Sequence, residues 1–324
     1  MHSHQPRLIA PNRQLAMVPA YLCAGLAAWL LFSAAHGQDN SAIPGPTEIR
    51  LWPSEAPFAR GGSPHDVPSA YWYPATSAGA DEDSRSILIV LPGGGYGTLA
   101  IDHEGHDIAR WANSLGMSAL VVQYRHGGRG YRHPVPMLDA QRAVRLVRHR
   151  ASQWHVDPQR VGVIGFSAGG HLASTLLTHF DNGNVDAEDA IDRLSCRPDF
   201  GILCYPVIAL GEEFTHAGSQ RNLLGEQPDA SLVASLSNDK QVQQDTPPCF
   251  VWHTADDRVV AVENSLRFAA ALIRKGVPCE LHVFPHGRHG LGLARGHVGP
   301  DQWPELCSTW MKTIGVLRDG EPAR

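Results

Sequence analysis

Ser167 stands at the centre of a G-x-S-x-G motif, Gly165-Phe166-Ser167-Ala168-Gly169. When such a motif joins a strand to a helix, its sharp turn lifts the serine hydroxyl clear of the sheet, where it can attack a carbonyl carbon. The flanking glycines let the strand and the helix pass closely. The N–H of Ala168 would then lie at a helix N-terminus, where the helix dipole favours a developing negative charge. We therefore expect Ser167 to be a nucleophile and Ala168 to be one donor of an oxyanion hole.

Further oxyanion donors are expected from a glycine-rich segment, residues 91–96, which reads Leu-Pro-Gly-Gly-Gly-Tyr. Glycine has no Cβ, so its N–H can come close to a substrate oxygen. We expect Gly94 and Gly95 to be these donors. A phosphate-binding loop is the alternative, but the segment lacks the Gly-Lys-Ser/Thr ending of such loops and the spacing of a dinucleotide fingerprint.

A serine nucleophile of this kind is followed in the chain by an acid and then by a histidine. Asp256 and Asp257 follow the apolar segment 250–254, and we choose Asp257 because it stands two residues before a Val-Val pair. His289, which lies between an arginine and a glycine after the last apolar segment, is expected to accept the serine proton. Asp256 and His286 are the local alternatives.

Two other histidine-containing features are expected to be structural. His103, Glu104 and His106 resemble part of a zinc-binding helix, but the H-E-x-x-H motif places its histidines four residues apart, whereas these stand three apart. We therefore expect no metal site and no cofactor. His171, which follows the serine in the same predicted helix, is expected to bond backbone groups rather than to react.

These motifs fall between short apolar segments that alternate with helical patterns, which is typical of a mostly parallel sheet with helices on both faces. The segments are rich in Val, Ile and Leu, as strands buried on both faces should be. The expected strands are residues 86–91, 117–124, 160–165, 200–205, 250–254 and 280–284. The expected helices are residues 107–115, 137–150, 168–179, 263–275 and 303–314.

The remaining segments indicate no second domain. Residues 48–75 are expected to add edge strands to the sheet. Residues 206–248 form the longest connection without a predicted strand, with a short helix at 231–236, and a connection of this length usually serves as a functional loop over a site. Within the helix 137–150, the arginines Arg142, Arg145, Arg148 and Arg150 are expected to form a solvated face.

The first 37 residues read as a secretory signal. A basic start precedes an apolar run that ends in small residues, and we expect cleavage after Gly37. A retained membrane anchor is the alternative, because the run approaches the length of a spanning helix. Cleavage predicts a single domain over residues 38–324 in a secreted or periplasmic protein. It removes Cys23 and leaves five cysteines, so at least one thiol stays unpaired within the monomer. We expect Cys249 and Cys279, which lie in or beside apolar runs, to pack as small apolar side chains, with a disulfide as the alternative.

The composition is that of a soluble globular protein, with 43% hydrophobic and 18% charged residues. A formal net charge of −5 gives no basic surface for phosphates, which argues against nucleic acid and anionic membranes as partners. A neutral small molecule or oligosaccharide fits better.

Several segments resemble one family of enzymes. They are LPGGGYG at 91–97, DHEGHDIARW at 102–111, VVQYRHG at 121–127, DPQRVGVIGFSAGGHLAS at 157–174, WHTADDRVVAVENSL at 252–266 and GVPCELHVFPHGRHGLGLA at 276–294. In these the chain is similar to bacterial acetylxylan-esterase-like and feruloyl-esterase-like α/β-hydrolases. The resemblance implies an α/β-hydrolase fold without a large lid domain. It also implies a triad of Ser167, Asp257 and His289. The chain departs from the family pattern at Ala261, where proline is usual, and at His286, where lysine or a polar residue is usual.

The leading functional hypothesis is a secreted serine esterase that removes short acyl groups, chiefly acetyl, from carbohydrate esters such as acetylated xylan. A general carboxylesterase or lipase is the alternative on the same fold, but it would favour an apolar lid, and residues 206–248 are mixed in polarity. An exported peptidase usually carries a large N-terminal domain that is not evident here. A non-catalytic binding protein would have no need of a complete triad and oxyanion loop.

Overall fold

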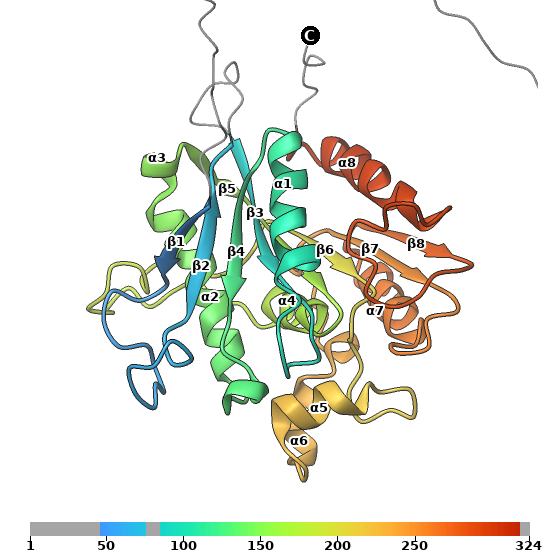
Figure 1. The fold of residues 1–324 in the computed structure, drawn as a ribbon, viewed down its shortest axis with the longest axis horizontal. Coiled ribbons are helices and arrows are strands. Elements are labelled where there is room, and N and C mark those ends of the chain that lie inside the picture. Colours follow the sequence, from blue (N-terminus) through green and yellow to red (C-terminus); the bar gives the residue numbers. More distant parts are fainter. Residues whose placement is uncertain (1–45, 76–84, 318–324) are drawn as a thin grey trace, which may run out of the picture. The chain divides into compact units, whose positions relative to one another are not determined.

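Residues 46–75 and 85–317 are described by a computed structural model, so the predicted signal segment, residues 1–37, lies outside the described residues. The described strands form one eight-stranded sheet in the order β1-β2-β4-β3-β5-β6-β7-β8 (Figure 1). β1 pairs with β2, and β2 with β4, in antiparallel orientation. All the other neighbours are parallel, as expected for the central part of the sheet.

The predicted strands are all present. Their ends differ from the prediction by no more than one residue, except that β5 begins at Val156, which pairs with Arg85 before a shift in register. The strands are β1 Thr47–Arg50, β2 Ser69–Tyr73, β3 Arg85–Leu91, β4 Ser118–Gln123, β5 Val156–Phe166, β6 Phe200–Cys204, β7 Cys249–Thr254 and β8 Cys279–Phe284.

The predicted helices are present too. They are α1 Asp107–Ser114, α2 Val135–His149, α4 Ala168–Thr178, α7 Glu263–Arg274 and α8 Trp303–Thr313, with shorter helices α3 Ala151–Trp154, α5 Ala217–Leu224 and α6 Ala230–Ser235. A π-helix, Asp102–His106, leads into α1, and 3-10 turns lie at Gly127–Arg129, Asn238–Lys240 and Pro300–Gln302. Within residues 46–75 and 85–317, no helix is long and apolar enough to span a membrane.

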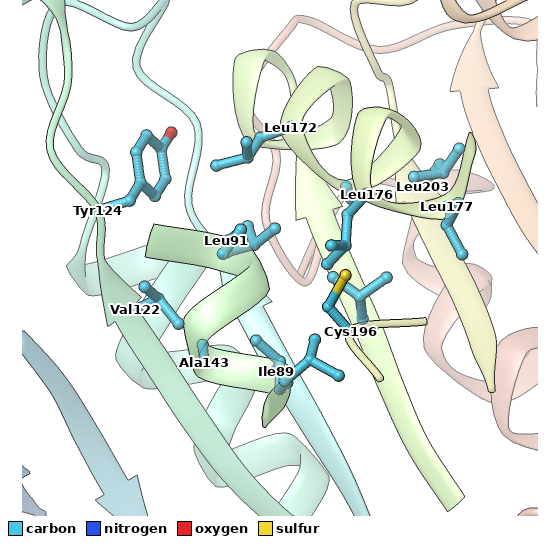
Figure 2. Packing of buried hydrophobic residues seen from close by; sticks show 14 of the residues in the cluster. Ile89, Leu91, Val122, Tyr124, Ala143, Leu172, Leu176, Leu177, Cys196 and Leu203 are labelled. Atoms are coloured by element: carbon cyan, nitrogen blue, oxygen red, sulfur yellow. The ribbon is translucent and has the colours of Figure 1, made fainter. Parts of the chain in front are cut away.

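Successive residues of the central strands face opposite layers of the core, as the period of a strand requires. In β3, Ile89 belongs to the cluster that contains side chains of α2, α4 and α7, whereas Val90 belongs to the cluster that contains side chains of α1 and α8. Figure 2 shows part of the first cluster, with Ala143 of α2 and Leu172 of α4 among its members. Helices therefore cover both faces of the sheet. The loops that connect strands to helices emerge at the edge formed by the carboxyl ends of the parallel strands.

The expected solvated arginine face of α2 is wrong. The side chains of Arg145 and Arg148 are only 12% and 13% exposed, and the largest departure is at Arg142. Its side chain is only 1% exposed and forms ion pairs with Asp189 (2.7 Å) and Asp192 (2.9 Å), and its Nε donates to the backbone O of Leu51. A sequence pattern could not show this, because both aspartates come from a distant loop that folds over the helix.

The connection 206–248 contains two short helices. The predicted helix at 231–236 is α6, with Asp229 as its N-cap, and α5 precedes it without having been predicted. Figure 1 shows both helices projecting beyond the sheet. The connection is therefore ordered by helix capping and by its contacts with the loops of the sheet.

The described cysteines are all free, as expected for Cys249 and Cys279. Cys196, Cys204, Cys249 and Cys307 are buried, and Cys279 is half-buried.

Candidate active site

Ser167 lies at the turn between β5 and α4, where its motif predicts it. Its backbone adopts φ 52° and ψ −118°, a conformation that residues with a side chain rarely adopt. A Cβ on Gly165 would collide with the backbone O of Gly169, and a Cβ on Gly169 would collide with the backbone O of Leu91. Both glycines are therefore needed for the close crossing of strand and helix.

The strained turn is tied to the ends of β6 and β7. Ser167 N–H donates to Cys204 O (3.0 Å), and Val207 N–H donates to Ser167 O (3.0 Å). Between them, Tyr205 has φ 36°, and its N–H donates to Trp252 O (2.8 Å). The serine is thus held by the rigid carboxyl edge of the sheet, which offsets the cost of its conformation.

Ser167, His289 and Asp257 form a continuous hydrogen-bonded chain. The Nε2 atom of His289 lies 2.8 Å from Ser167 Oγ, and its Nδ1 atom lies 2.6 Å from Asp257 Oδ2. Asp257 follows β7 and His289 follows β8, so parallel strands bring the three residues to one edge of the sheet. A serine hydroxyl in this arrangement can transfer its proton to the imidazole as it attacks a carbonyl, while the carboxylate stabilises the imidazolium.

Asp257 is fixed by more than the imidazole of His289. Its Oδ1 accepts the backbone N–H groups of Val259 (2.8 Å) and Val260 (3.0 Å), and its Oδ2 lies 3.4 Å from His253 Nε2. Burial by itself raises the pKa of this carboxyl, but the hydrogen bonds from His253, His289 and Val259 outweigh burial and hold the pKa well below its ordinary value. The carboxylate is therefore charged throughout the physiological range. The sequence analysis did not predict a role for His253.

The two local alternatives pair with each other instead. Asp256 Oδ2 lies 3.1 Å from His286 Nδ1, and Asp256 Oδ1 accepts the N–H of Gly287 (2.7 Å). The side chain of His286 is 86% exposed. This pair lies outside the Ser167 hydrogen-bonded chain and stabilises the loop that carries His289.

The glycine-rich segment lies against the serine. A Cβ on Gly93 would be 3.0 Å from Ser167 Cβ, so these two backbones are in close contact. Gly94 and Gly95 adopt φ 127° and 62°, conformations that favour glycine. Among the hydrogen bonds of the described residues, none uses the N–H of Gly94, Gly95 or Ala168 as a donor. These three N–H groups are the predicted oxyanion donors, and they remain available for a ligand oxygen.

Glu104 is a buried carboxylate beneath this segment, and the sequence analysis did not identify its role. Its Oε2 accepts the N–H of Gly93 (2.9 Å), and its Oε1 accepts the hydroxyl of Tyr205 (2.8 Å). The Tyr205 oxygen in turn accepts the N–H of Gly292 (2.8 Å) from the loop that follows His289. Burial is the largest influence on the Glu104 carboxyl and raises its pKa.

This network connects both sides of the site. Glu104 joins the glycine-rich segment to Tyr205, and the ring of Tyr205 packs edge-on against the imidazole of His289, with 5.0 Å between centroids. The residues that form hydrogen bonds with Glu104 lie far apart in the sequence. The only signal in the sequence is the position of this carboxylate in a helical segment.

The connection 206–248 also contacts the glycine-rich segment. Asn222 of α5 donates from Nδ2 to Gly95 O (2.8 Å). His171 of α4 lies 2.9 Å from Tyr96 Oη through Nδ1 and 2.9 Å from Leu236 O through Nε2. The expectation that His171 bonds a backbone group is therefore confirmed, although that group belongs to the connection. His171 thus links the glycine-rich segment, α4 and the connection 206–248.

Within residues 46–75 and 85–317, no group of three or more His, Cys, Asp and Glu side chains is arranged to hold a metal ion. Both carboxylate oxygens of Glu104 are occupied by hydrogen-bond donors, as described above.

The doubly covered, mostly parallel sheet, with a strained serine between strand and helix and an acid and a histidine on later loops, defines an α/β-hydrolase. The chain belongs to the BD-FAE family, whose model matches residues 77–272, more than half of the sequence.

The curated relatives agree with this family assignment. The chain is 42% identical over 216 residues to endo-1,4-beta-xylanase B of Butyrivibrio fibrisolvens, covering 66% of this chain and 34% of that protein. It is 34% identical over 245 residues to an acetylxylan esterase of Xylanibacter ruminicola, covering 74% of this chain and 48% of that protein. The chain thus spans about half or less of the length of these relatives.

A solved structure matches over its whole length. The acetyl ester-xyloside bifunctional hydrolase from Caldicellulosiruptor lactoaceticus shares 48% identity and a TM-score of 0.80, covering 86% of this chain and 100% of that chain. The carboxylesterase Cest-2923 from Lactobacillus plantarum shares 26% identity and a TM-score of 0.69, covering 85% and 99%.

Proposed function

We propose that this chain is a serine carboxylic-ester hydrolase that removes short acyl groups, chiefly acetyl, from carbohydrate esters such as acetylated xylan. The single observation that carries the proposal is the Ser167–His289–Asp257 hydrogen-bonded chain beside the unpaired N–H groups of Gly94, Gly95 and Ala168. Its export, with cleavage after Gly37, is part of the proposal and would suit a polymeric substrate.

In the first half of the reaction, Ser167 Oγ attacks the ester carbonyl carbon as His289 Nε2 takes the hydroxyl proton. The carbonyl oxygen gains negative charge and is stabilised by the N–H groups of Gly94, Gly95 and Ala168. When the intermediate collapses, the bond to the alcohol oxygen breaks, and His289 returns the proton to that oxygen. The products of this half are a free alcohol and an acyl group esterified to Ser167.

In the second half, a water molecule attacks the acyl carbon as His289 takes one of its protons. Collapse of the second intermediate releases the carboxylic acid and returns the proton to Ser167 Oγ. Asp257 stays ionised in both halves, because its hydrogen bonds keep its pKa low.

The preference for a short acyl group and a polar alcohol is supported by the residues that approach the oxyanion segment. Asn222 and His216 of the connection 206–248, which lie against Gly95, are both polar. A lipase instead gains about 0.8 kcal/mol for each methylene that it buries. The names of the relatives support the carbohydrate part of the proposal.

The test is a chain-length series. We expect kcat/KM for p-nitrophenyl acetate to exceed that for the butyrate and octanoate by about tenfold or more, which corresponds to about 1.4 kcal/mol of transition-state binding. Acetate should also be released from acetylated xylan. A preference for octanoate would overturn the short-acyl proposal in favour of a lipase, and failure to release acetate from xylan would overturn its carbohydrate part.

A further inference from the structure

His216 caps the N-terminus of α5, and this contact fixes its tautomer. The backbone N–H of Ser219 donates to His216 Nδ1 (3.3 Å), and Ser219 Oγ lies 2.8 Å from the same atom. An N–H can donate only to a ring nitrogen that carries no proton. In neutral His216 the proton is therefore on Nε2.

The Nε2 atom of His216 is accessible and has no protein partner. It takes part in none of the hydrogen bonds of the described residues, and it is not among their buried polar atoms that lack a partner. A polar ring atom in this position faces solvent or a bound ligand. It is a donor without an acceptor in the free protein.

The imidazole of His216 lies beside the glycine-rich segment. A Cβ on Gly95 would lie 3.9 Å from His216 Cε1, the ring atom between Nδ1 and Nε2. α5 is held over the same glycine by Asn222, which donates to Gly95 O (2.8 Å). The ring is thus placed by two contacts of α5, the cap at one end and Asn222 at the other.

The electrostatic surroundings of His216 agree with this placement. Burial lowers its pKa, the nearby His289 lowers it further, and Asp257 opposes the change. His216 therefore lies close enough to the triad to respond to its charges. As a neutral ring, it suits neutral acceptors such as hydroxyl and ether oxygens.

We propose that His216 is a specificity-determining residue whose Nε2–H donates a hydrogen bond to an oxygen of the alcohol part of the ester, a sugar hydroxyl or ring oxygen next to the acylated position. The inference rests on the proposed function, since the acceptor belongs to the carbohydrate. The backbone N–H groups bind the carbonyl oxygen, and His289 returns its proton to the ester oxygen of the alcohol. A donor close to these N–H groups and to His289 can therefore reach the sugar that carries the ester.

His216→Asn separates the donor from the cap. Asparagine is a good N-cap, so its side-chain oxygen can still accept the N–H of Ser219, but it is too short to carry a donor to the position of Nε2. The matched control is Ser219→Ala, which removes a hydroxyl from the same contact and leaves the Nε2–H in place. Thermal melts of both variants check that the fold is retained.

The measurement is the ratio of kcat/KM for an acetylated methyl xyloside to kcat/KM for p-nitrophenyl acetate, which has no hydroxyl or ring oxygen beside its ester. We expect His216→Asn to lower this ratio about five- to tenfold, the value of one neutral hydrogen bond. Ser219→Ala should leave the ratio at its wild-type value.

Three results would overturn the role of His216. One is an unchanged ratio in His216→Asn, whether both activities fall together or neither falls, with the wild type active on the xyloside. The second is an equal fall of the ratio in Ser219→Ala, which would assign the effect to the position of α5. The third is a wild type that cleaves p-nitrophenyl acetate but not the xyloside, and only this result also removes the carbohydrate part of the proposed function.

Discussion

Asp256 and Asp257 are adjacent in the sequence but face different histidines. Asp257 Oδ2 lies 2.6 Å from His289 Nδ1, whereas Asp256 Oδ2 lies 3.1 Å from His286 Nδ1. The side chain of Asp257 is fully buried, and that of Asp256 is half-exposed. The backbone N–H groups of Val259 and Val260 orient Asp257 inward, so the turn after β7 decides which carboxylate faces the base.

This arrangement predicts very different effects for two neighbouring substitutions. Asp257→Asn should lower kcat by about 10⁴-fold, because the amide cannot stabilise the imidazolium or hold its tautomer. Asp256→Asn should change kcat less than about threefold. Steady-state kinetics on p-nitrophenyl acetate measures both. A reversal of the two effects would mean that Asp256 is the acid.

The nucleophile is tested by Ser167→Ala. Removal of Oγ should lower kcat by about 10⁴-fold or more, because no acyl-enzyme can form, while the circular dichroism spectrum stays that of the wild type. A fluorophosphonate should label Ser167 alone, as peptide mass spectrometry would show. Activity close to that of the wild type, or labelling at another residue, would contradict the assignment.

The Glu104 network predicts a loss of stability together with a loss of activity. Glu104→Ala leaves the N–H of Gly93 and the hydroxyl of Tyr205 buried without their acceptor, at a cost of about 1–3 kcal/mol for each group. We expect the free energy of unfolding in urea to fall by about 2–6 kcal/mol for these two groups. The value of kcat should fall with it, because Gly93 precedes the oxyanion donors.

Glu104→Gln is the control for that experiment. Its amide oxygen can accept from Gly93 and its NH₂ group can donate to Tyr205 Oη, so more of the stability should be retained than in Glu104→Ala. Equal stability of the alanine variant and the wild type would show that the network does not stabilise the site.

His171 predicts a dependence of stability on pH. Burial lowers its pKa to about 4, and the Leu236 carbonyl only partly opposes this. The unfolded chain, with a histidine pKa of about 6.5, binds more protons than the native state between these values, so stability falls as the pH falls. The His171 contribution should decrease by about 2 kcal/mol from pH 7 to pH 5.

His171→Gln isolates this contribution. Glutamine can accept from Tyr96 and donate to Leu236 but does not titrate in this range. Urea unfolding at pH 7 and pH 5 should show a loss of stability that is smaller by about 2 kcal/mol in the variant than in the wild type. Equal losses in both proteins would show that protonation of His171 does not destabilise the fold.

Much of the fold could be predicted because its signals are local. The Val-, Ile- and Leu-rich strands alternate with amphipathic helices, and the ends of five of the six central strands were predicted within one residue. The predicted positions of Ser167, Asp257 and His289 at the ends of strands are also local, because parallel strands bring their carboxyl ends to a common edge. Helix α5 was not predicted, because its eight residues carry only a weak apolar pattern and a histidine cap.

The sequence by itself determined the parallel sheet, the elbow around Ser167 and the glycine-rich segment. It also limited the candidates for the acid to Asp256 and Asp257 and those for the base to His286 and His289. Only the tertiary structure decided that Glu104 joins Gly93 to Tyr205 and that His216 lies over Gly95. The physical reason is distance along the chain. Turn chemistry and hydrophobic periodicity act between near neighbours, whereas these contacts join segments that meet only when the sheet has formed and the loops at its edge have packed together.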